Sequence, residues 1–128
     1  PAFDGVDLSA GENQLFGTEK VDKRHFTAFS MTHNTAANAE IADEETIKIM
    51  NPLNYIGKPG INLPQNWRIR VGTNDRDTSL AVSAVLAAKL QNNGQTVNYA
   101  LPWDVGHGGD YDLDELFAWM KQVSSSAK

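Results

Sequence analysis

Three side chains that could accept or transfer a proton stand in two turns of this 128-residue sequence. Asp75 and Asp77 lie in the turn Gly-Thr-Asn-Asp-Arg-Asp-Thr-Ser, and His107 lies in the turn Pro-Trp-Asp-Val-Gly-His-Gly-Gly. A carboxylate that accepts a hydrogen bond from one imidazole nitrogen leaves the other nitrogen free to act as a general base. Each residue alone has a commoner explanation, because aspartate often forms turns and a histidine among glycines is usually a surface residue. The chemistry therefore depends on whether the fold brings the two turns together.

Both turns follow segments that have the pattern of strands. Residues 67–71 alternate large apolar with basic side chains, which is typical of a strand with one buried face. Residues 78–91 carry apolar side chains three and four apart and predict a helix, which Thr78 or Asp77 can cap. Residues 96–101 predict a second strand. A strand, helix and strand joined by short connections predict parallel neighbours with a right-handed crossover, so both turns should meet at one edge of the sheet.

The N-terminal residues have weaker patterns. The apolar residues of segment 1–20 show neither the helical nor the strand period, which predicts a loop with a short helical turn near residues 12–16. The apolar spacing over residues 21–37 permits a helix. We assign His25 and His33, which fall within this segment, to surface or lid positions with no role.

Further helices are predicted on either side of the central stretch. Residues 43–50 begin with acids and end before Asn-Pro, as a short helix does, and residues 51–65 follow as a long structured loop. After the histidine turn, Asp112 and Glu115 match a capping box for a final helix, whose apolar stripe continues to Val123.

Length and composition limit the fold and the kinds of partner. One compact unit is expected at this length. The formal net charge is −5 with no basic block, so we expect no nucleic-acid partner and no anionic membrane partner. There is no cysteine, which excludes disulfides and thiolate sites. No apolar run is long enough for a membrane span, and the cellular location stays open.

Three segments carry a resemblance to a known family. They are Gly-Thr-Asn-Asp-Arg-Asp-Thr-Ser-Leu-Ala-Val at 72–82, Leu-Gln-Asn-Asn-Gly at 90–94, and Leu-Pro-Trp-Asp-Val-Gly-His-Gly-Gly-Asp-Tyr-Asp-Leu-Asp-Glu-Leu-Phe at 101–117. Together they resemble the C-terminal part of the bacterial tannase and feruloyl-esterase-like group of α/β-hydrolases. The resemblance is specific over residues 67–120 and vaguer before them.

The resemblance implies an α/β fold that forms the C-terminal portion of an α/β-hydrolase, with parallel edge strands, flanking helices and part of a lid insertion in front. On this basis residues 1–40 are the lid segment, and residues 41–128 belong to the C-terminal part of the core rather than to an independent domain. The order of an aspartate followed by a histidine also agrees with α/β-hydrolases, in which the serine comes earlier.

The resemblance also implies roles for individual residues. Asp75 matches the acid of the Ser-His-Asp triad and His107 matches the base. Asp77 matches a second carboxylate that binds the galloyl group in the family's tannases, although it could equally be a helix cap. Glu12 is a candidate for a lid glutamate that contacts the same group. The resemblance implies no cofactor and no metal. The family pattern Pro-His-Ser-Gly is replaced here by Gly-His-Gly-Gly, which leaves the identity of the ester open.

The sequence lacks the nucleophile that such a triad needs. No Gly-x-Ser-x-Gly occurs in it, and none of its serines lies on a strand-to-helix elbow flanked by glycines. The first residue is Pro1 rather than methionine, which we interpret as a processed chain or a fragment. We therefore expect the serine and the oxyanion hole on a partner, the N-terminal chain of the same precursor, with a small phenolic ester as substrate.

Other functions stay open at this stage. Asp75-Arg-Asp-Thr-Ser could be a Mg²⁺-dependent phosphotransfer turn, although that motif normally follows its strand directly. A metal site formed by His107, Asp110 and Asp112 is possible by ligand type, but one histidine with two flexible carboxylates is a poor set. A non-catalytic binding or regulatory subunit is the third alternative, and the absent serine favours it.

Overall fold

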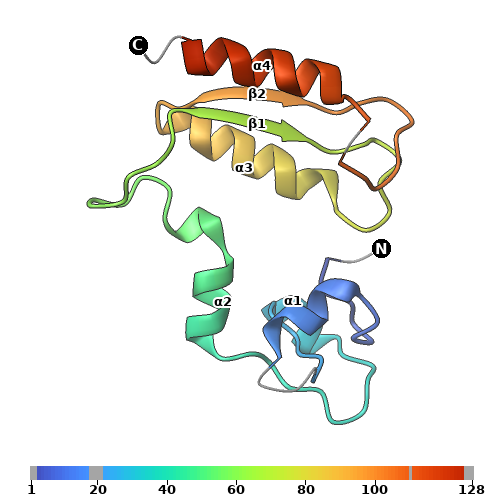
Figure 1. The fold of residues 1–128 in the computed structure, drawn as a ribbon. Coiled ribbons are helices and arrows are strands. Elements are labelled where there is room, and N and C mark those ends of the chain that lie inside the picture. Colours follow the sequence, from blue (N-terminus) through green and yellow to red (C-terminus); the bar gives the residue numbers. More distant parts are fainter. Residues whose placement is uncertain (1–2, 18–21, 110, 126–128) are drawn as a thin grey trace.

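The computed structural model describes residues 3–17, 22–109 and 111–125 (Figure 1). Its helices and strands, with η for a 3₁₀-helix, are η1 (Gly11–Phe16), α1 (Ala28–Thr32), α2 (Glu44–Met50), η2 (Pro52–Asn54), β1 (Asn66–Arg70), α3 (Leu80–Asn92), β2 (Thr96–Ala100) and α4 (Leu113–Ser125). A loop-rich N-terminal unit, residues 3–17 and 22–42, surrounds α1, and a unit built on the sheet contains α3 and α4. Helix α2 lies between them (Figure 1).

The sheet has the topology that the sequence predicts. Strands β1 and β2 pair in parallel, with Asn66 opposite Thr96 and Arg70 opposite Ala100. Helix α3 connects the two strands, which lie between α3 and α4 in Figure 1. The predicted strand–helix–strand unit is confirmed, and the chain is a small α/β arrangement with a parallel sheet and flanking helices. Both turns of interest follow the carboxyl ends of their strands.

One face of α3 holds that helix against the sheet. Its buried residues are Ser83, Ala87 and Leu90, and their spacing of four and three places them on a single side. Leu90 is fully buried, and the hydroxyl groups of Ser83 and Tyr99 lie 3.2 Å apart between helix and strand. This packing fixes where α3 begins relative to β1, and therefore the length of the turn between them.

The cap of α3 differs from the prediction. The Ser79 hydroxyl accepts a hydrogen bond from the N–H of Ala81 at 3.3 Å, so Ser79 caps the helix. The prediction that Thr78 or Asp77 does so is wrong. The backbone N–H groups of these two residues donate instead to the Asp75 carboxylate.

The N-terminal unit has a small aromatic core. Phe16, Phe26 and Ala42 are buried together, and the rings of Phe16 and Phe26 stack with centroids 4.0 Å apart. Helix η1 confirms the helical turn predicted near residues 12–16. Because Ala42 belongs to this core, the chain beyond residue 40 still contacts the unit; the division into a lid segment 1–40 and a hydrolase part 41–128 stays a prediction.

Helix α1 is much shorter than the segment that the sequence permits. Of the described part of residues 21–37, only Ala28–Thr32 is helical, and the Thr27 side chain begins it by accepting from the Ser30 N–H at 3.2 Å. The helix predicted over the rest of this segment is wrong. The chain before Thr27 is extended because His25 pairs through its backbone with the segment around Ile41.

The two histidines of this segment have different environments. His33 is exposed, as predicted, and its ring stacks on Phe29. For His25 the predicted surface position is wrong, because its side chain is completely buried, whereas the predicted lid position is not tested. The cause is a set of internal hydrogen bonds from both ring nitrogens, described below.

Helix α2 and the loop behind it follow the prediction. The Asp43 carboxylate accepts from the N–H of Thr46 at 2.8 Å and caps α2, which ends at Met50 with Asn51 as its C-cap before Pro52. Ile56 is buried and anchors the loop that leads to β1.

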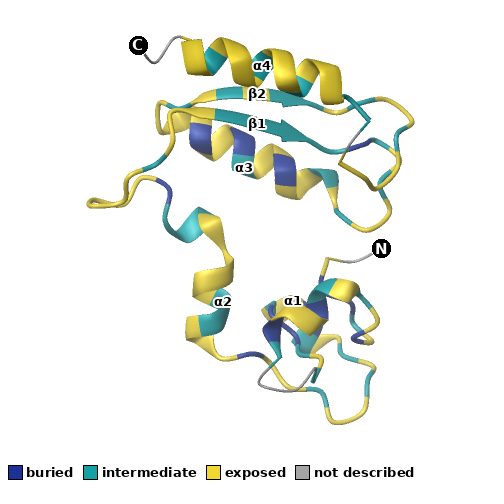
Figure 2. Cartoon of the chain, viewed as in Figure 1, coloured by how far each residue is buried: buried dark blue, intermediate teal, exposed yellow. Residues whose placement is uncertain are grey.

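Large apolar residues are exposed on α3, on α4 and in the loop after β2. Figure 2 shows the exposed positions of these elements in yellow. Examples are Val85, Phe117 and Trp103, of which Trp103 is 87% exposed. Within the described residues, these faces are only partly covered. No helix in the described part of the chain combines the length and apolar character needed to cross a lipid bilayer.

Candidate active site

Backbone hydrogen bonds join the turn after β1 to the turn after β2. The N–H of Thr73 donates to the Pro102 carbonyl and the N–H of Asn74 donates to the Val105 carbonyl, both at 2.9 Å. The N–H of Asp104 donates to the Thr73 hydroxyl at 2.7 Å. These bonds continue the contact between the strands past their ends, so the two turns form one rigid edge.

Gly72 makes this approach possible. A Cβ atom at this position would lie 2.6 Å from the carbonyl carbon of Val105 and 2.8 Å from the carbonyl oxygen of Gly106. Both distances are far inside van der Waals contact, so only glycine allows the backbones to come this close. The sequence contains a signal for this feature, a glycine directly after a strand, but the pattern alone does not say what it contacts.

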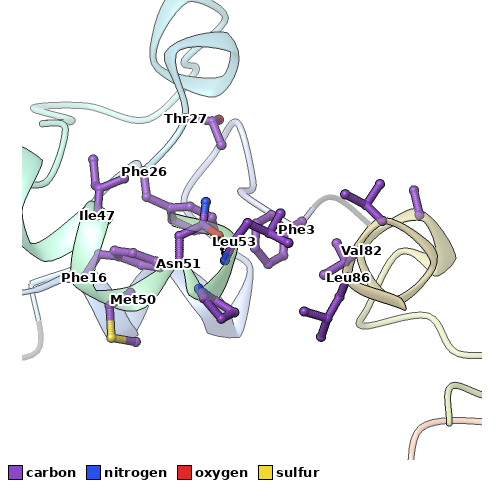
Figure 3. Close-up of a pocket in the computed structure, with 13 residues that line it drawn as sticks. Phe3, Phe16, Phe26, Thr27, Ile47, Met50, Asn51, Leu53, Val82 and Leu86 are labelled. Atoms are coloured by element: carbon purple, nitrogen blue, oxygen red, sulfur yellow. Dashed lines mark hydrogen bonds between the residues drawn. The ribbon is translucent and has the colours of Figure 1, made fainter. Parts of the chain in front are cut away.

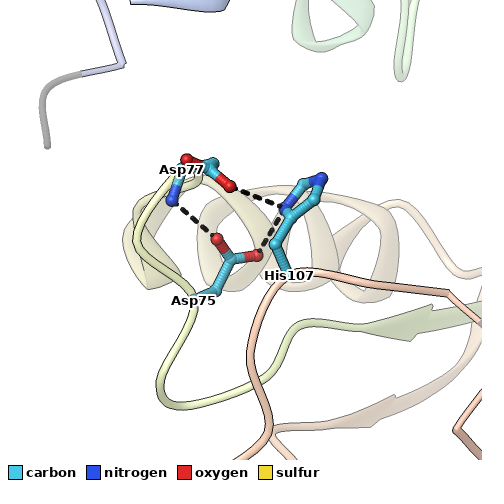
Figure 4. A group of neighbouring side chains, drawn as sticks. All are labelled: Asp75, Asp77 and His107. Carbon is cyan, nitrogen blue, oxygen red and sulfur yellow. Dashed lines mark hydrogen bonds and ion pairs between the residues drawn. The ribbon is translucent and has the colours of Figure 1, made fainter.

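The two turns place Asp75 beside His107. The Asp75 Oδ2 atom lies 3.1 Å from the Nδ1 atom of His107. The other oxygen, Oδ1, accepts from the backbone N–H groups of Asp77 at 2.8 Å and Thr78 at 3.0 Å, which fix the plane of the carboxylate. Figure 4 shows the second ring nitrogen of His107 on the side away from the carboxylates. The pair therefore has the geometry of an acid that orients a base.

Burial and charge distinguish the two members of the pair. The Asp75 side chain is 7% exposed, whereas the His107 side chain is 63% exposed. The hydrogen bond from the Thr78 N–H, assisted by the pairing with His107, outweighs desolvation and holds the pKa of Asp75 below its ordinary value. The carboxylate therefore stays ionised and able to orient the ring at neutral pH.

The same carboxylate acts on the histidine. The hydrogen bond and the charge of Asp75 hold the pKa of His107 above its ordinary value. The negative charges of Asp77 and Glu12 act in the same direction. The imidazolium form is therefore stabilised, as a base needs when it has taken up a proton.

Asp77 and Glu12 line one cavity next to this pair. Asp77 Oδ2 lies 3.8 Å from His107 Nδ1, and its side chain is 65% exposed. The cavity has a volume of about 340 Å³ and lies between Asp77 and the segment from Gly5 to Glu12. The structure thus brings together all four residues singled out from the sequence; their individual roles stay predictions.

Asp112, the residue after Tyr111, has a structural role that the sequence did not indicate. Its carboxylate pairs with the guanidinium groups of Arg68 and Arg70 on β1, the latter at 3.4 Å. The Arg68 hydrogen bond, with the charges of both arginines, outweighs desolvation and holds the pKa of Asp112 below its ordinary value. This pairing ties the end of the histidine loop to the sheet. The capping box of Asp112 with Glu115 stays a prediction.

A candidate metal-binding cluster in the described part of the chain is the pair together with Asp77. In the described residues, one ligand atom each from Asp75, Asp77 and His107 lie within 4.8 Å of one another. However, both oxygens of Asp75 already accept hydrogen bonds, and one histidine with two carboxylates is a poor ligand set. Of the alternative set with His107, Asp112 is engaged by arginines and Asp110 lies outside the described residues.

A larger apolar cavity lies elsewhere. Its volume is about 390 Å³, and it lies between the aromatic residues of the N-terminal unit, α2 and α3 (Figure 3). Phe3 and Phe26 line one side and Val82 and Leu86 the other, and no lining residue titrates. It therefore cannot supply acid–base chemistry.

Comparisons with known proteins show what this chain resembles. No family model matches the sequence, and a search of curated proteins gives no match either. Among solved structures, the tannase from Lactobacillus plantarum is 46% identical over 96% of this chain, with a TM-score of 0.83. A tannin acyl hydrolase in complex with ethyl gallate is 46% identical over 96% of the chain, with a TM-score of 0.82. The Fusobacterium nucleatum tannase is 50% identical over 96% of the chain, with a TM-score of 0.78.

This chain is tannase-like. The resemblance inferred from the sequence is thereby confirmed, and it extends over the N-terminal residues that the motifs left vague. The tannase-like chain spans only 26–27% of the length of these neighbours.

Proposed function

We propose that this chain supplies the acid and the base of a Ser-His-Asp triad in a carboxylesterase that hydrolyses phenolic esters. The observation that carries the proposal is the contact between His107 Nδ1 and Asp75 Oδ2 at 3.1 Å, with the second ring nitrogen on the open side. The similarity to tannases over 96% of the chain supports the same conclusion.

The geometry accounts for each step that these residues perform. Asp75 accepts from Nδ1–H and keeps the Nε2 atom of His107 unprotonated and accessible. His107 takes the proton of the serine hydroxyl as the serine attacks the ester carbonyl, and it returns this proton to the leaving alcohol. Water then repeats the cycle on the acyl-enzyme. The Asp75 carboxylate stabilises the imidazolium formed in both halves of the reaction.

The cavity beside the pair suggests the class of ester. Carboxylates such as those of Asp77 and Glu12 accept hydrogen bonds well from phenolic hydroxyl groups, whereas a plain acyl group would leave them without a partner. One of the similar structures was solved with ethyl gallate, an ester of a trihydroxylated aromatic acid. We therefore propose galloyl and related hydroxylated aromatic esters as substrates.

The serine comes from polypeptide outside these 128 residues. In this proposal the chain is the C-terminal portion of an α/β-hydrolase fold, with residues 1–40 in a lid insertion and β1 and β2 at the edge of a larger sheet. We propose that the remainder is the N-terminal chain of the same precursor; an uncut polypeptide would form the same triad.

The proposal is tested on the complete protein that contains this sequence. We expect it to hydrolyse ethyl gallate and to react with a serine-directed fluorophosphonate probe. Replacing His107 by Ala or Asp75 by Asn should lower kcat by about 10⁴-fold while the protein remains folded. His33→Ala, at an exposed histidine of the N-terminal unit, is the matched control and should leave kcat unchanged.

Two outcomes would refute the assignment. Near-normal turnover in either triad variant would remove these residues from the mechanism. A folded complete protein that neither reacts with the probe nor hydrolyses ethyl gallate would favour a binding subunit. The intact mass of the labelled species shows whether the serine lies on a separate chain.

A further inference from the structure

A buried polar cluster, which the proposed triad does not use, lies in the N-terminal unit. Asp4, Asn13 and His25 are 4%, 0% and 0% exposed. The Oδ1 atom of Asp4 accepts from His25 Nδ1 at 2.9 Å and from Asn13 Nδ2 at 2.7 Å. Buried ionisable groups are costly unless they are paired, so this cluster needs a structural or functional reason.

The Asp4 carboxylate is saturated with donors. Its second oxygen, Oδ2, accepts from the backbone N–H groups of Phe26 and Thr27 at 2.9 and 2.8 Å and from the Thr27 hydroxyl at 2.8 Å. Five donors on one carboxylate favour the ionised form. Although burial acts in the opposite direction, the hydrogen bonds from His25 and from these neighbours hold the pKa of Asp4 below its ordinary value.

The surroundings of His25 define its charge as well. Its Nε2 atom lies 3.0 Å from the Asn34 Oδ1 atom. The orientation of that amide is fixed, because its oxygen accepts from the Ala36 N–H and its nitrogen donates to the Ala36 carbonyl. Both ring nitrogens of His25 thus face acceptors, and both can be satisfied only if both carry a proton. This geometry favours an imidazolium that is paired with Asp4.

Among the described residues, Asp4 is the charged side chain that pairs with the ring. From the neighbouring segment, the backbone carbonyl of Glu40 accepts the N–H of His25. The Glu40 side chain pairs with Arg24 at 2.9 Å instead. Burial lowers the pKa of His25, and the hydrogen bonds to Asn34 and Asp4 outweigh this effect and raise it overall.

Asn13 connects this ion pair to the candidate substrate cavity. Its Nδ2 group donates to Asp4 and to the Arg24 carbonyl, and its Oδ1 atom accepts from the Gly5 N–H at 3.2 Å. Gly5 and Glu12 lie on the wall that faces Asp77 across the cavity. The segment between Asp4 and Asn13 is therefore held at both ends by the same buried cluster.

This segment needs such support because its backbone is strained. Leu8 has a φ of 59°, in the left-handed region that residues with a side chain rarely adopt. Val6 is held additionally by the N–H of Thr35, which donates to its carbonyl at 2.8 Å.

We propose that the Asp4–His25 ion pair positions the Glu12 wall of the cavity against Asp77, and that His25 is thereby a positioning residue for recognition of phenolic hydroxyl groups. The inference rests on the proposed function, because it assigns the cavity to the aromatic part of the ester. His25 touches neither the reacting atoms nor the substrate. Its removal should therefore weaken the binding of a hydroxylated ring rather than the chemistry at His107.

Binding measurements on the complete protein test this role without relying on turnover. We expect His25→Gln to raise the dissociation constant for gallate about tenfold and that for benzoate less than twofold, since only gallate offers phenolic hydroxyl groups. His33→Gln, which replaces an exposed histidine of the same unit, is the matched control and should change neither constant. Equal weakening for both ligands, or unchanged binding of gallate, would overturn the positioning role.

A spectroscopic readout tests the ion pair itself in the unmodified protein. In the complete protein labelled with ¹⁵N-histidine, both ring nitrogens of His25, assigned by their loss in His25→Gln, should carry protons at neutral pH. A neutral ring with one unprotonated nitrogen would overturn the ion pair. If the protein binds gallate and shows the imidazolium but hydrolyses no ester, the proposed esterase function fails while this inference stands.

Discussion

Substituting Gly72 by alanine should separate Asp75 from His107 without removing either side chain. A Cβ atom at position 72 would overlap the carbonyl group of Val105. It would lie 2.6 Å from the carbonyl carbon of Val105 and 2.8 Å from the carbonyl oxygen of Gly106. Both neighbours are backbone atoms and cannot rotate away as a side chain could. The histidine loop must therefore move away from the turn after β1.

The size of this movement follows from contact distances. Two carbon atoms without a bond between them need about 3.5 Å, so the loop must shift by about 1 Å. His107 lies two residues after Val105, and its Nδ1 atom is 3.1 Å from Asp75. A shift of this size takes the pair beyond hydrogen-bonding distance and also breaks the 2.9 Å bond from Asn74 to Val105. We expect kcat/KM to fall about 100-fold.

The assay is hydrolysis of ethyl gallate by the complete protein, with circular dichroism and thermal melting to show that the variant folds. Gly106→Ala is the matched control, because a Cβ atom there has nothing within 4 Å in this chain, although Gly106 is adjacent to His107. It should retain most of the activity. Wild-type kcat/KM in Gly72→Ala would show that the close approach does not determine the position of the histidine.

Three further predictions concern charge, packing and metals. Asp77→Asn should move the acid limb of the pH profile of kcat/KM to lower pH. His107 must be neutral to act as a base, and the charge of Asp77 raises the pKa of His107. A shift of the acid limb to higher pH would contradict this reasoning. Leu90→Ala should lower the free energy of unfolding by about 3 kcal/mol in urea denaturation, because the Leu90 side chain is fully buried. A change below about 1 kcal/mol would show that the neighbouring side chains fill the space that Leu90 leaves. A chelator should leave ester hydrolysis unchanged, because both Asp75 oxygens are occupied by hydrogen bonds. Activity that is lost with the chelator and restored by Mg²⁺ would favour the Mg²⁺-dependent phosphotransfer turn instead.

The sheet unit could be predicted because its signals are local. Periodicity located β1, α3 and β2, and the rule for parallel strands then brought Asp75 and His107 to one edge. The cap of α3 could not be predicted in the same way, because Asp77, Thr78 and Ser79 are adjacent and can all cap helices. The choice depended on Asp75, which captures the N–H groups of the first two.

The N-terminal unit could not be predicted because its contacts are neither periodic nor local. Asp4 meets His25 across 21 positions in the sequence, and the contact joins two side chains that the pattern assigned to a loop and to the surface. A buried histidine gives no signal in a single sequence, since the same residue is common at surfaces. The wrong surface position predicted for His25 and the helix predicted over residues 21–37 both result from these non-local contacts.

The two parts of the site depend on different portions of the chain, and this makes rate and selectivity separable. The contact between Asp75 and His107 is fixed by backbone bonds between the two turns and by Gly72, without the N-terminal unit. The wall with Glu12 depends on Asn13 and the buried pair behind it. A change near Gly72 should therefore lower kcat for every ester. A change at His25 should instead raise KM only for esters with phenolic hydroxyl groups, and comparing the two variants on ethyl gallate and ethyl benzoate would reveal whether the division holds.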